Sequence, residues 1–246
     1  MEDWPVKVIV AASQKGGSGK TTLVRSLAVA AEARHAPVVM LDTDPQGSLT
    51  SWYNRRAAET PQLAQLGSQP AKEALEQLRD AGAKLVLVDT PPSVHPFVQG
   101  LIEAADLVLV PVRPSPDDLG AIGPTLELIE AAGRPFAFVI TQAKPRARLA
   151  AEALRVLAEH GRVAPAIIGD RADYPLAAVS GLVVTESAAG SKAALEVLDL
   201  LGFVERQISM MRVKNGKLKS AQHGRNYSPE GISAARDCRG AAASYG

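Results

Sequence analysis

A glycine-rich loop with two lysines stands between an apolar stretch and a segment of helical spacing, and over residues 14–22 it reads QKGGSGKTT. Glycines let the backbone amides of residues 17–21 turn toward an anion, and the following helix start adds the positive end of its dipole. Lys20 would reach the β- and γ-phosphates of a nucleotide, and the Thr21 hydroxyl would ligate Mg²⁺. A plain strand-to-helix turn explains neither the Lys-Thr pair nor its place after the first apolar stretch. We therefore predict that a nucleotide binds at Gly16, Gly17, Ser18, Gly19, Lys20, Thr21 and Thr22.

Carboxylates close two further apolar stretches. Asp42 and Asp44 follow the apolar run that begins at residue 37, and Asp89 ends the run 84–89. Phosphoryl transfer needs Mg²⁺ and an oriented water more than covalent help from the protein. Carboxylates two residues apart at a strand end can both face the loop region once the chain leaves the pleat. Each motif is weak alone, since turn residues of this kind are common, but their positions after the glycine-rich loop favour a role at the nucleotide.

The order of residues in the loop departs from the usual pattern G-x-x-x-x-G-K-[ST], which would place glycine where this chain has Gln14. The lysine-first loop instead resembles the deviant Walker A motif of ParA/MinD-type ATPases, in which the extra lysine crosses a nucleotide sandwich dimer to the partner's phosphates. Lys15 matches that position, and a solvated loop lysine is the alternative. The resemblance covers about residues 6–207. It is nearest to small plasmid-type ParA proteins without an N-terminal helix-turn-helix domain.

The acidic motifs resemble the switch segments of the same family. The sequence DTDPQ at 42–46 is similar to switch I, in which Asp44 would position the attacking water and Asp42 would support the Mg²⁺ shell. The sequence DTPP at 89–92 is similar to switch II, in which Asp89 would hold a Mg²⁺-bound water. Together with the loop, the resemblance implies catalytic roles for Lys15, Lys20 and Asp44 and metal-binding roles for Thr21, Asp42 and Asp89.

The family resemblance also implies a function. It implies an ATPase that uses ATP and Mg²⁺, forms a homodimer with ATP and binds duplex DNA without sequence preference. A centromere-binding, ParB-like adaptor would stimulate hydrolysis, and the cycle would segregate plasmid or chromosome DNA in the cytoplasm, with the ATP form on the nucleoid. The segment PVRPSPDDL at 111–119 resembles one that packs at the family's dimer face, although a rigid strand-exit loop explains its prolines equally well.

Three residues outside these motifs are weaker candidates. Arg171, in the sequence GDR at 169–171, lies where related chains carry a DNA-contacting arginine, and Lys192 lies near the start of the final helix. A solvated surface charge is the alternative for both, and for Lys192 it is the better one. Gln142 follows the fifth apolar stretch and is a candidate contact to the adenine base.

Functions other than DNA segregation have their own sequence requirements. A MinD-like ATPase that cycles on membranes would need an amphipathic terminal helix, whereas Gly216 interrupts a tail without a sustained apolar face. A MinD-like membrane cycle is therefore the weaker alternative. A positioning ATPase for another cargo, such as a protein cluster or a conjugation complex, remains an alternative because the nucleotide motifs say nothing about cargo. No acceptor-substrate cluster indicates a metabolic kinase, and the loop is not the G-x-G-x-x-G of dinucleotide enzymes.

Strand-length apolar runs alternate with segments of helical spacing along the chain. This pattern predicts an α/β fold, an open, doubly wound and mainly parallel sheet flanked by helices. Residues 60–70 are expected to form a loop. The predicted strands are 6–12, 37–42, 84–89, 106–112, 135–141 and 163–168, and the predicted helices are 21–34, 71–81, 117–132, 147–160 and about 188–207.

Composition and charge set the domain organisation. With 246 residues and 46% hydrophobic residues, the chain suits one ATPase domain over 1–208, followed by a tail over 209–246 that is expected to be disordered. The tail carries a charge of +5 and leaves −4 for the body. No stretch approaches the ~20 apolar residues of a membrane helix. A single cysteine and four scattered histidines provide neither a disulfide framework nor a metal cluster.

Overall fold

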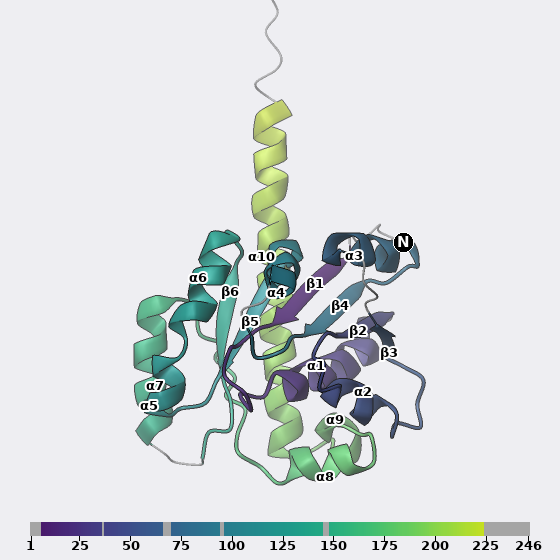
Figure 1. The fold of residues 1–246 in the computed structure, drawn as a ribbon, viewed down its shortest axis with the longest axis vertical. Coiled ribbons are helices and arrows are strands. Elements are labelled where there is room, and N and C mark those ends of the chain that lie inside the picture. Colours follow the sequence, from purple (N-terminus) through teal and green to yellow (C-terminus); the bar gives the residue numbers. More distant parts are fainter. Residues whose placement is uncertain (1–5, 36, 66–69, 94–95, 145–147, 224–246) are drawn as a thin grey trace, which may run out of the picture. The chain divides into compact units, whose positions relative to one another are not determined.

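The computed structural model describes residues 6–35, 37–65, 70–93, 96–144 and 148–223, with backbone alone for His35 and 211–223. The chain divides into two units, Met1–Ile208 and Ser209–Gly246. Figure 1 shows the arrangement of the elements. The strands are β1 (Lys7–Ala11), β2 (Val38–Asp42), β3 (Gln62–Gln65), β4 (Leu85–Asp89), β5 (Leu107–Val112) and β6 (Phe136–Ile140). The helices are α1 (Lys20–His35), α2 (Ser48–Tyr53), α3 (Ala71–Asp80), α4 (Pro96–Ala104), α5 (Pro116–Gly120), α6 (Gly123–Ala131), α7 (Arg148–His160), α8 (Asp173–Val179), α9 (Val184–Ser187) and α10 (Lys192–His223).

The six strands form one sheet in the order β3-β2-β4-β1-β5-β6, and every pair is parallel. The predicted fold class is thereby confirmed. Because all strands run the same way, their carboxyl ends meet at one edge, which brings the ends of β1, β2 and β4 side by side. The loop after β1 and the carboxylates at the ends of β2 and β4 therefore share that edge.

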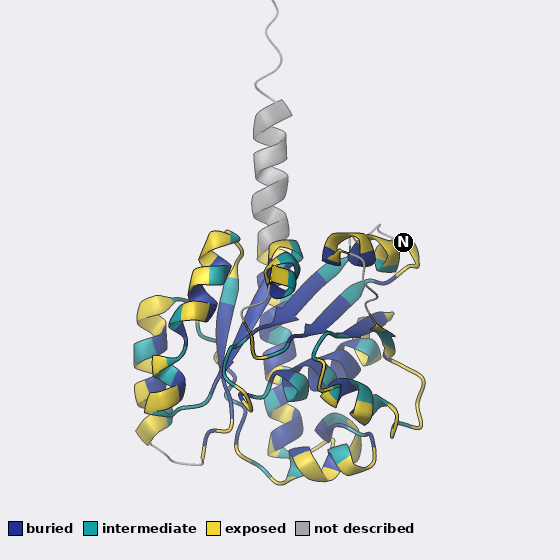
Figure 2. Cartoon of the chain, viewed as in Figure 1, coloured by how far each residue is buried: buried dark blue, intermediate teal, exposed yellow. Residues whose placement is uncertain are grey.

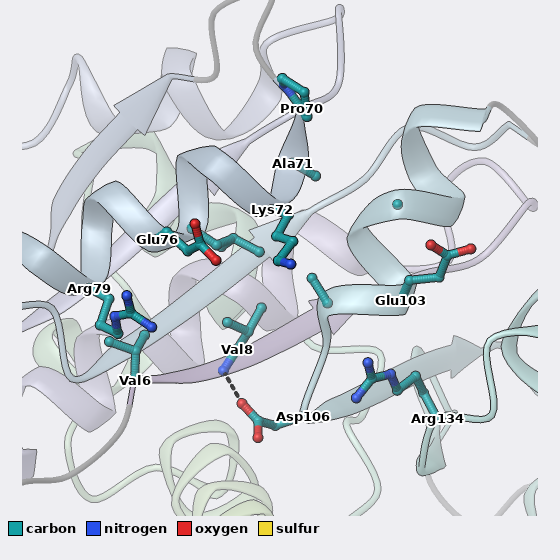
Figure 3. A pocket seen from close by; sticks show the side chains of 13 residues that line it. Val6, Val8, Pro70, Ala71, Lys72, Glu76, Arg79, Glu103, Asp106 and Arg134 are labelled. Carbon is teal, nitrogen blue, oxygen red and sulfur yellow. Dashed lines mark hydrogen bonds between the residues drawn. The ribbon is translucent and has the colours of Figure 1, made fainter.

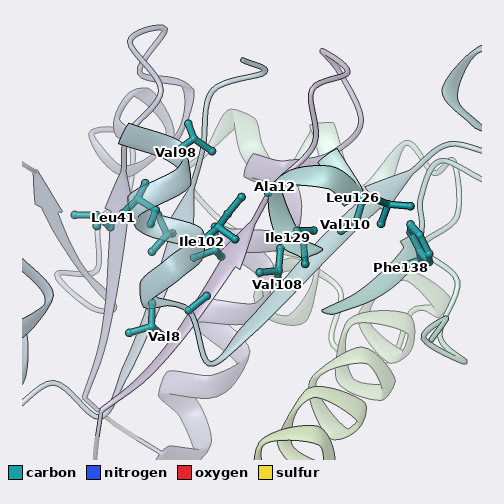
Figure 4. Close-up of a cluster of buried hydrophobic side chains, with 14 of the residues drawn as sticks. Val8, Ala12, Leu41, Val98, Ile102, Val108, Val110, Leu126, Ile129 and Phe138 are labelled. Carbon is teal, nitrogen blue, oxygen red and sulfur yellow. The ribbon is translucent and has the colours of Figure 1, made fainter. Parts of the chain in front are cut away.

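Burial explains why the strands are almost continuously apolar. One set of alternating strand residues packs with α3, α4, α6 and α7 into a cluster that includes Val8, Ile102, Val108, Ile129 and Phe138 (Figure 4). The intervening residues, such as Ile9 and Met40, are also buried, and α1 packs against β1, β2 and β4. A sheet covered on both faces leaves no polar side for its central strands. Figure 2 shows this as blue strands beneath helices with exposed outer faces.

Two strand predictions were wrong at the sheet edges. Residues 62–65, expected within a loop, form the edge strand β3 beside β2; with the sequence QLAQ, the strand is too short and polar to be recognised by its apolar content. The run 163–168 forms no named strand. It keeps one isolated bridge to β6, between Phe138 and Val163, and Pro165 has no N–H to continue a ladder.

The last helix also differs from its prediction. α10 begins at Lys192 and continues to His223, well beyond the expected end near Gln207. Residues after 207 include Met, Arg, Lys and Leu, which favour helix, and one glycine costs only about 1 kcal/mol. The predicted disordered tail therefore starts with helical residues, while its part from 224 onward lies outside the described residues. Within the described residues, no helix has the length and apolar content needed to cross a bilayer.

Candidate nucleotide site

The loop after β1 has the backbone geometry of an anion cradle. Gly17 and Gly19 adopt positive φ angles of 71° and 99°, a region that favours glycine. The Thr141 hydroxyl donates to the Ser18 carbonyl over 2.7 Å, and the Gln142 side-chain amide donates to the Gly17 carbonyl over 2.6 Å. Outside the helix ladder, the amides of residues 16–22 donate no hydrogen bond to another described residue. The residues after β6 thus hold two carbonyls of the loop. The loop amides that have no partner can donate to a phosphate group.

Lys20 opens α1 with its ammonium group placed in the loop. Its side chain is buried, and Nζ donates to the Ser13 carbonyl over 3.0 Å. Burial lowers the pKa of Lys20, and the nearby charges of Asp89 and Asp44 act in the opposite direction. A phosphate group would give this partly desolvated cation a strong charged partner.

Thr21 and Asp89 meet across the start of α1 and the end of β4. The Thr21 hydroxyl donates to Asp89 Oδ2 over 2.6 Å. Asp89 is only 1% exposed, and its Oδ1 has no hydrogen-bond partner among the described residues. Burial raises the pKa of Asp89 to about 7, although the Thr21 hydrogen bond and the Lys20 charge lower it. A buried carboxylate oxygen without a partner beside a threonine hydroxyl fits the Mg²⁺ that accompanies a nucleotide. Within the described residues, no group of three or more His, Cys, Asp or Glu side chains could hold a metal ion. Nucleotide phosphates and waters would therefore provide the remaining ligands of Mg²⁺.

The two carboxylates at the end of β2, Asp42 and Asp44, have different surroundings. Asp42 Oδ2 accepts from the backbone N–H and the hydroxyl of Thr50, at 2.8 and 2.7 Å, and so anchors the first turns of α2. Asp44 is partly exposed, and its Oδ1 accepts from the Gln46 N–H. Among the described residues, Asp44 thus keeps an oxygen available for a water, whereas Asp42 binds Thr50 of α2. The Mg²⁺ role of Asp42 stays a prediction, and the structure adds an anchoring role that the sequence did not indicate.

A cavity of about 450 Å³ opens beside the loop, and it is large enough for a nucleoside. It contains the predicted base contact, Gln142, whose φ of 51° is unusual for a residue with a side chain. Its lining includes Gly19, Thr22, Arg25, Gln142, Asp170, Arg171 and Tyr174. Sequence reasoning missed Thr141 and Arg25, because a single threonine after a strand or a single arginine in a helix has no distinctive pattern.

The two predicted DNA contacts lie in different settings. Arg171 lines the cavity beside the loop and donates to Glu196 Oε1 through Nη2 and Nε, at 2.6 and 3.0 Å. Lys192 is exposed at the first turn of α10. The structure joins Arg171 to the nucleotide cavity rather than to Lys192, and both DNA roles remain predictions.

A larger cavity of about 600 Å³ lies at the opposite, amino end of the strands (Figure 3). Asp106 accepts there from the Val8 N–H and from Lys7 Nζ, both at 2.9 Å. Its other charged residues have both signs and include Lys72, Glu76, Arg79, Glu103 and Arg134. None of the predicted nucleotide residues lines it. We therefore place the nucleotide in the smaller cavity beside the phosphate loop.

Comparisons with known proteins agree with this geometry. The family model of the CobQ/CobB/MinD/ParA nucleotide binding domain matches residues 9–184. "Maintenance of carboxysome distribution protein A" from Gloeobacter kilaueensis is 34% identical over 73% of this chain and 84% of its own length. The protein of the same name from Halothiobacillus neapolitanus is 32% identical, with coverages of 80% and 95%. Protein ParA of Rhizobium radiobacter is 36% identical over 57% of this chain and 67% of its own length.

Solved structures support the fold. The ATP complex of a Cyanothece McdA variant superposes with a TM-score of 0.65 at 18% identity, over 84% of this chain and 97% of its own. The MinC:MinD cell division protein complex of Aquifex aeolicus gives a TM-score of 0.68 at 18% identity, with coverages of 81% and 96%. The predicted membership of the ParA/MinD family is confirmed. The predicted closer resemblance to plasmid-type ParA proteins is not confirmed. The chain belongs to the CobQ/CobB/MinD/ParA nucleotide-binding family and is an ATPase with the lysine-first phosphate loop.

Proposed function

We propose that this chain is a positioning ATPase that distributes a large protein assembly within the cell. The observation that carries this proposal is the match to two carboxysome distribution proteins, which cover 73% and 80% of the chain. The nucleotide motifs are compatible with DNA cargo and with protein-cluster cargo, and these relatives make protein-cluster cargo the better interpretation.

The proposed mechanism uses the residues at the carboxyl edge of the sheet. Lys20 and the free amides of the loop bind the β- and γ-phosphates, while Thr21 and Asp89 would hold Mg²⁺. The metal, when bound, would neutralise charge on the phosphate oxygens. Asp44 orients the attacking water through the part of its carboxylate that Gln46 does not occupy. Hydrolysis on this machinery alone should be slow, because it depends on dimer closure and an adaptor.

ATP would also control the partners. A sandwich dimer forms when Lys15 of each subunit reaches the γ-phosphate of the other, since ADP lacks the group that it binds. The dimer binds duplex DNA without sequence preference and uses the nucleoid as its track. An adaptor on the cargo stimulates hydrolysis and releases the ATPase into the cytoplasm. Local basic groups must supply the DNA contacts, because the body carries −4.

Segregation of plasmid or chromosome DNA is the second candidate. It is supported by the 36% identity to the ParA of Rhizobium radiobacter. In that case the adaptor would be a ParB-like protein bound to a centromere site. The two candidates share the nucleotide cycle and differ only in what the adaptor holds.

Affinity capture with a nuclease step separates the candidates. Asp44→Ala, loaded with ATP, serves as bait in an extract of the source cells. Lys20→Ala, which should not bind ATP, serves as the control. A protein-assembly adaptor should remain with its large assembly after nuclease digestion. If digestion instead releases the adaptor from its cargo, and the recovered DNA is enriched in one locus, the DNA-segregation candidate replaces the first.

A further inference from the structure

Arg113 lies beside the phosphate loop without belonging to any nucleotide motif. It is the first residue after β5, and its Nη1 would be 4.0 Å from a Cβ placed on Gly17. The guanidinium is partly exposed, with 34% of the side chain accessible. The family segment in which it lies, P-V-x-P-S-P-x-D-L, leaves this position open. An arginine at such a place is available to an anion near the loop.

Asp118 holds the Arg113 side chain from behind. Its Oδ1 accepts from Arg113 Nε over 2.9 Å, and its Oδ2 accepts from the Ser115 hydroxyl. Burial by itself raises the pKa of Asp118, but the hydrogen bonds from Arg113 and Ser115 outweigh burial and lower it. Only Nε is used in this contact. The Nη1 and Nη2 groups, which form the outer fork of the guanidinium, donate no hydrogen bond to another described residue.

The sheet order places Arg113 on the side of the loop away from the Mg²⁺ residues. β1 stands between β4 and β5, so Asp89 lies on one side of the phosphate loop and Arg113 on the other. Lys15 shares with Arg113 a cavity of about 430 Å³. Both cations therefore lie on the same side of the loop, away from the subunit's own catalytic carboxylates.

We propose that Arg113 is a second catalytic cation that acts across the dimer, and that its outer fork contacts the phosphates of the nucleotide in the facing subunit. This inference rests on the ATP sandwich dimer proposed above. Lys15 provides one point charge from this cavity, and Arg113 adds a planar fork that matches phosphate oxygens. The fork would stabilise charge that develops on the γ-phosphoryl group and on its leaving oxygen.

A purely structural role predicts a different outcome. If Arg113 only stabilises the start of α5, then Arg113→Gln should be harmless, because the glutamine amide can still donate to Asp118. If the charge acts on phosphate, then Arg113→Gln should lower kcat by roughly 10²-fold, the scale of one transition-state donor. ATP affinity of the monomer and the melting temperature should stay unchanged. Arg113→Lys should recover only part of the rate. The matched control is Arg134→Gln, at an exposed arginine at the other end of the sheet.

Mixing two variants tests whether the contact crosses the dimer. Asp44→Ala subunits bind ATP without hydrolysing it, and Arg113→Gln subunits retain Asp44. In a mixed dimer, the site with Asp44 would receive Arg113 from its partner, so mixing should restore turnover well above the sum of the two variants alone. No restoration, or full activity of Arg113→Gln by itself, overturns the inference. Light scattering of the parent with ATP separates this result from failure of the dimer proposal, because the parent must dimerise first.

Discussion

The hydroxyl of Thr21 and the carboxylate of Asp89 are 2.6 Å apart, and this contact joins the first turn of α1 to the end of β4. It is also the point at which the nucleotide-free fold carries an electrostatic cost. Asp89 is nearly inaccessible to solvent, and one of its oxygens is without a partner among the described residues. A site built for a cation therefore destabilises the protein when the cation is absent.

Asp89→Asn should stabilise the nucleotide-free protein above pH 7. The folded-state pKa of Asp89 is raised from 3.8 to about 7, so its contribution to stability is full below pH 4 and is lost as pH rises toward 7. Asparagine removes this pH dependence, with a gain in Tm of roughly 2–4 °C per kcal/mol. Thermal melts at pH 5 and pH 8 measure it. A variant less stable than the parent at pH 8 would contradict the electrostatic cost assigned to Asp89. The same variant should lose Mg²⁺-dependent ATP binding.

Lys20→Ala should abolish ATP binding and turnover. The variant loses the cation that is buried in the loop, and the remaining amides cannot replace a charged contact to phosphate. Fluorescent ATP titration and phosphate release measure the effect, with Lys72→Ala on the far end of the sheet as the control. Turnover at the parental rate in Lys20→Ala would show that the phosphate site lies elsewhere.

Asp44→Ala should bind ATP normally and hydrolyse it at least about 10²-fold more slowly, because the phosphate cradle remains while the water loses its orienting carboxylate. It should accumulate as a dimer on size-exclusion chromatography with ATP. Asp42→Ala is the informative comparison. It should instead lower the melting temperature, since it removes both contacts to Thr50.

Features of this fold that depend on short-range patterns could be predicted, and features that depend on distant neighbours could not. The phosphate loop and the central strands were predictable because glycines, a Lys-Thr pair and apolar runs lie close together in the sequence. The edge strand β3 and the loss of a strand at 163–168 depend on which neighbours the sheet offers, and the sequence does not encode this locally. The Asp42 contact to α2 and the Arg171 contact to Glu196 join residues 8 and 25 positions apart. Such pairs appear only when the fold brings them together.

Lys15→Gln should prevent ATP-dependent dimerisation while it leaves monomer ATP binding intact. Glutamine keeps most of the side-chain bulk, so the change reports on the charge that crosses to the partner's γ-phosphate. Light scattering with ATP and with ADP measures the dimer, in the Asp44→Ala background to prevent turnover. Equal dimer fractions with and without the Lys15→Gln change would disprove the sandwich geometry.

The last prediction concerns which part of the proposed ATP-bound dimer would contact DNA. Arg171 donates to the Glu196 carboxylate through two nitrogens, and only 23% of its side chain is accessible. A DNA phosphate would have to compete with that carboxylate. The segment 209–246 carries +5, whereas the body carries −4. A dimer carries two copies of this basic segment, so we expect the segment to supply most of the contacts to DNA phosphates.

Truncation after Ile208 in the Asp44→Ala background should therefore remove most binding to non-specific duplex DNA. Arg171→Gln, which can still donate to Glu196, and Lys192→Ala should each have a small effect. Electrophoretic shifts over a range of salt measure the contacts, because log affinity falls with log salt by about 0.9 for each phosphate neutralised. A thermal melt checks that the truncated body remains folded. If the truncated dimer keeps the affinity and the salt slope of the full chain, and Arg171→Gln loses both, the folded body carries the DNA site and the Arg171–Glu196 pair must open when DNA binds.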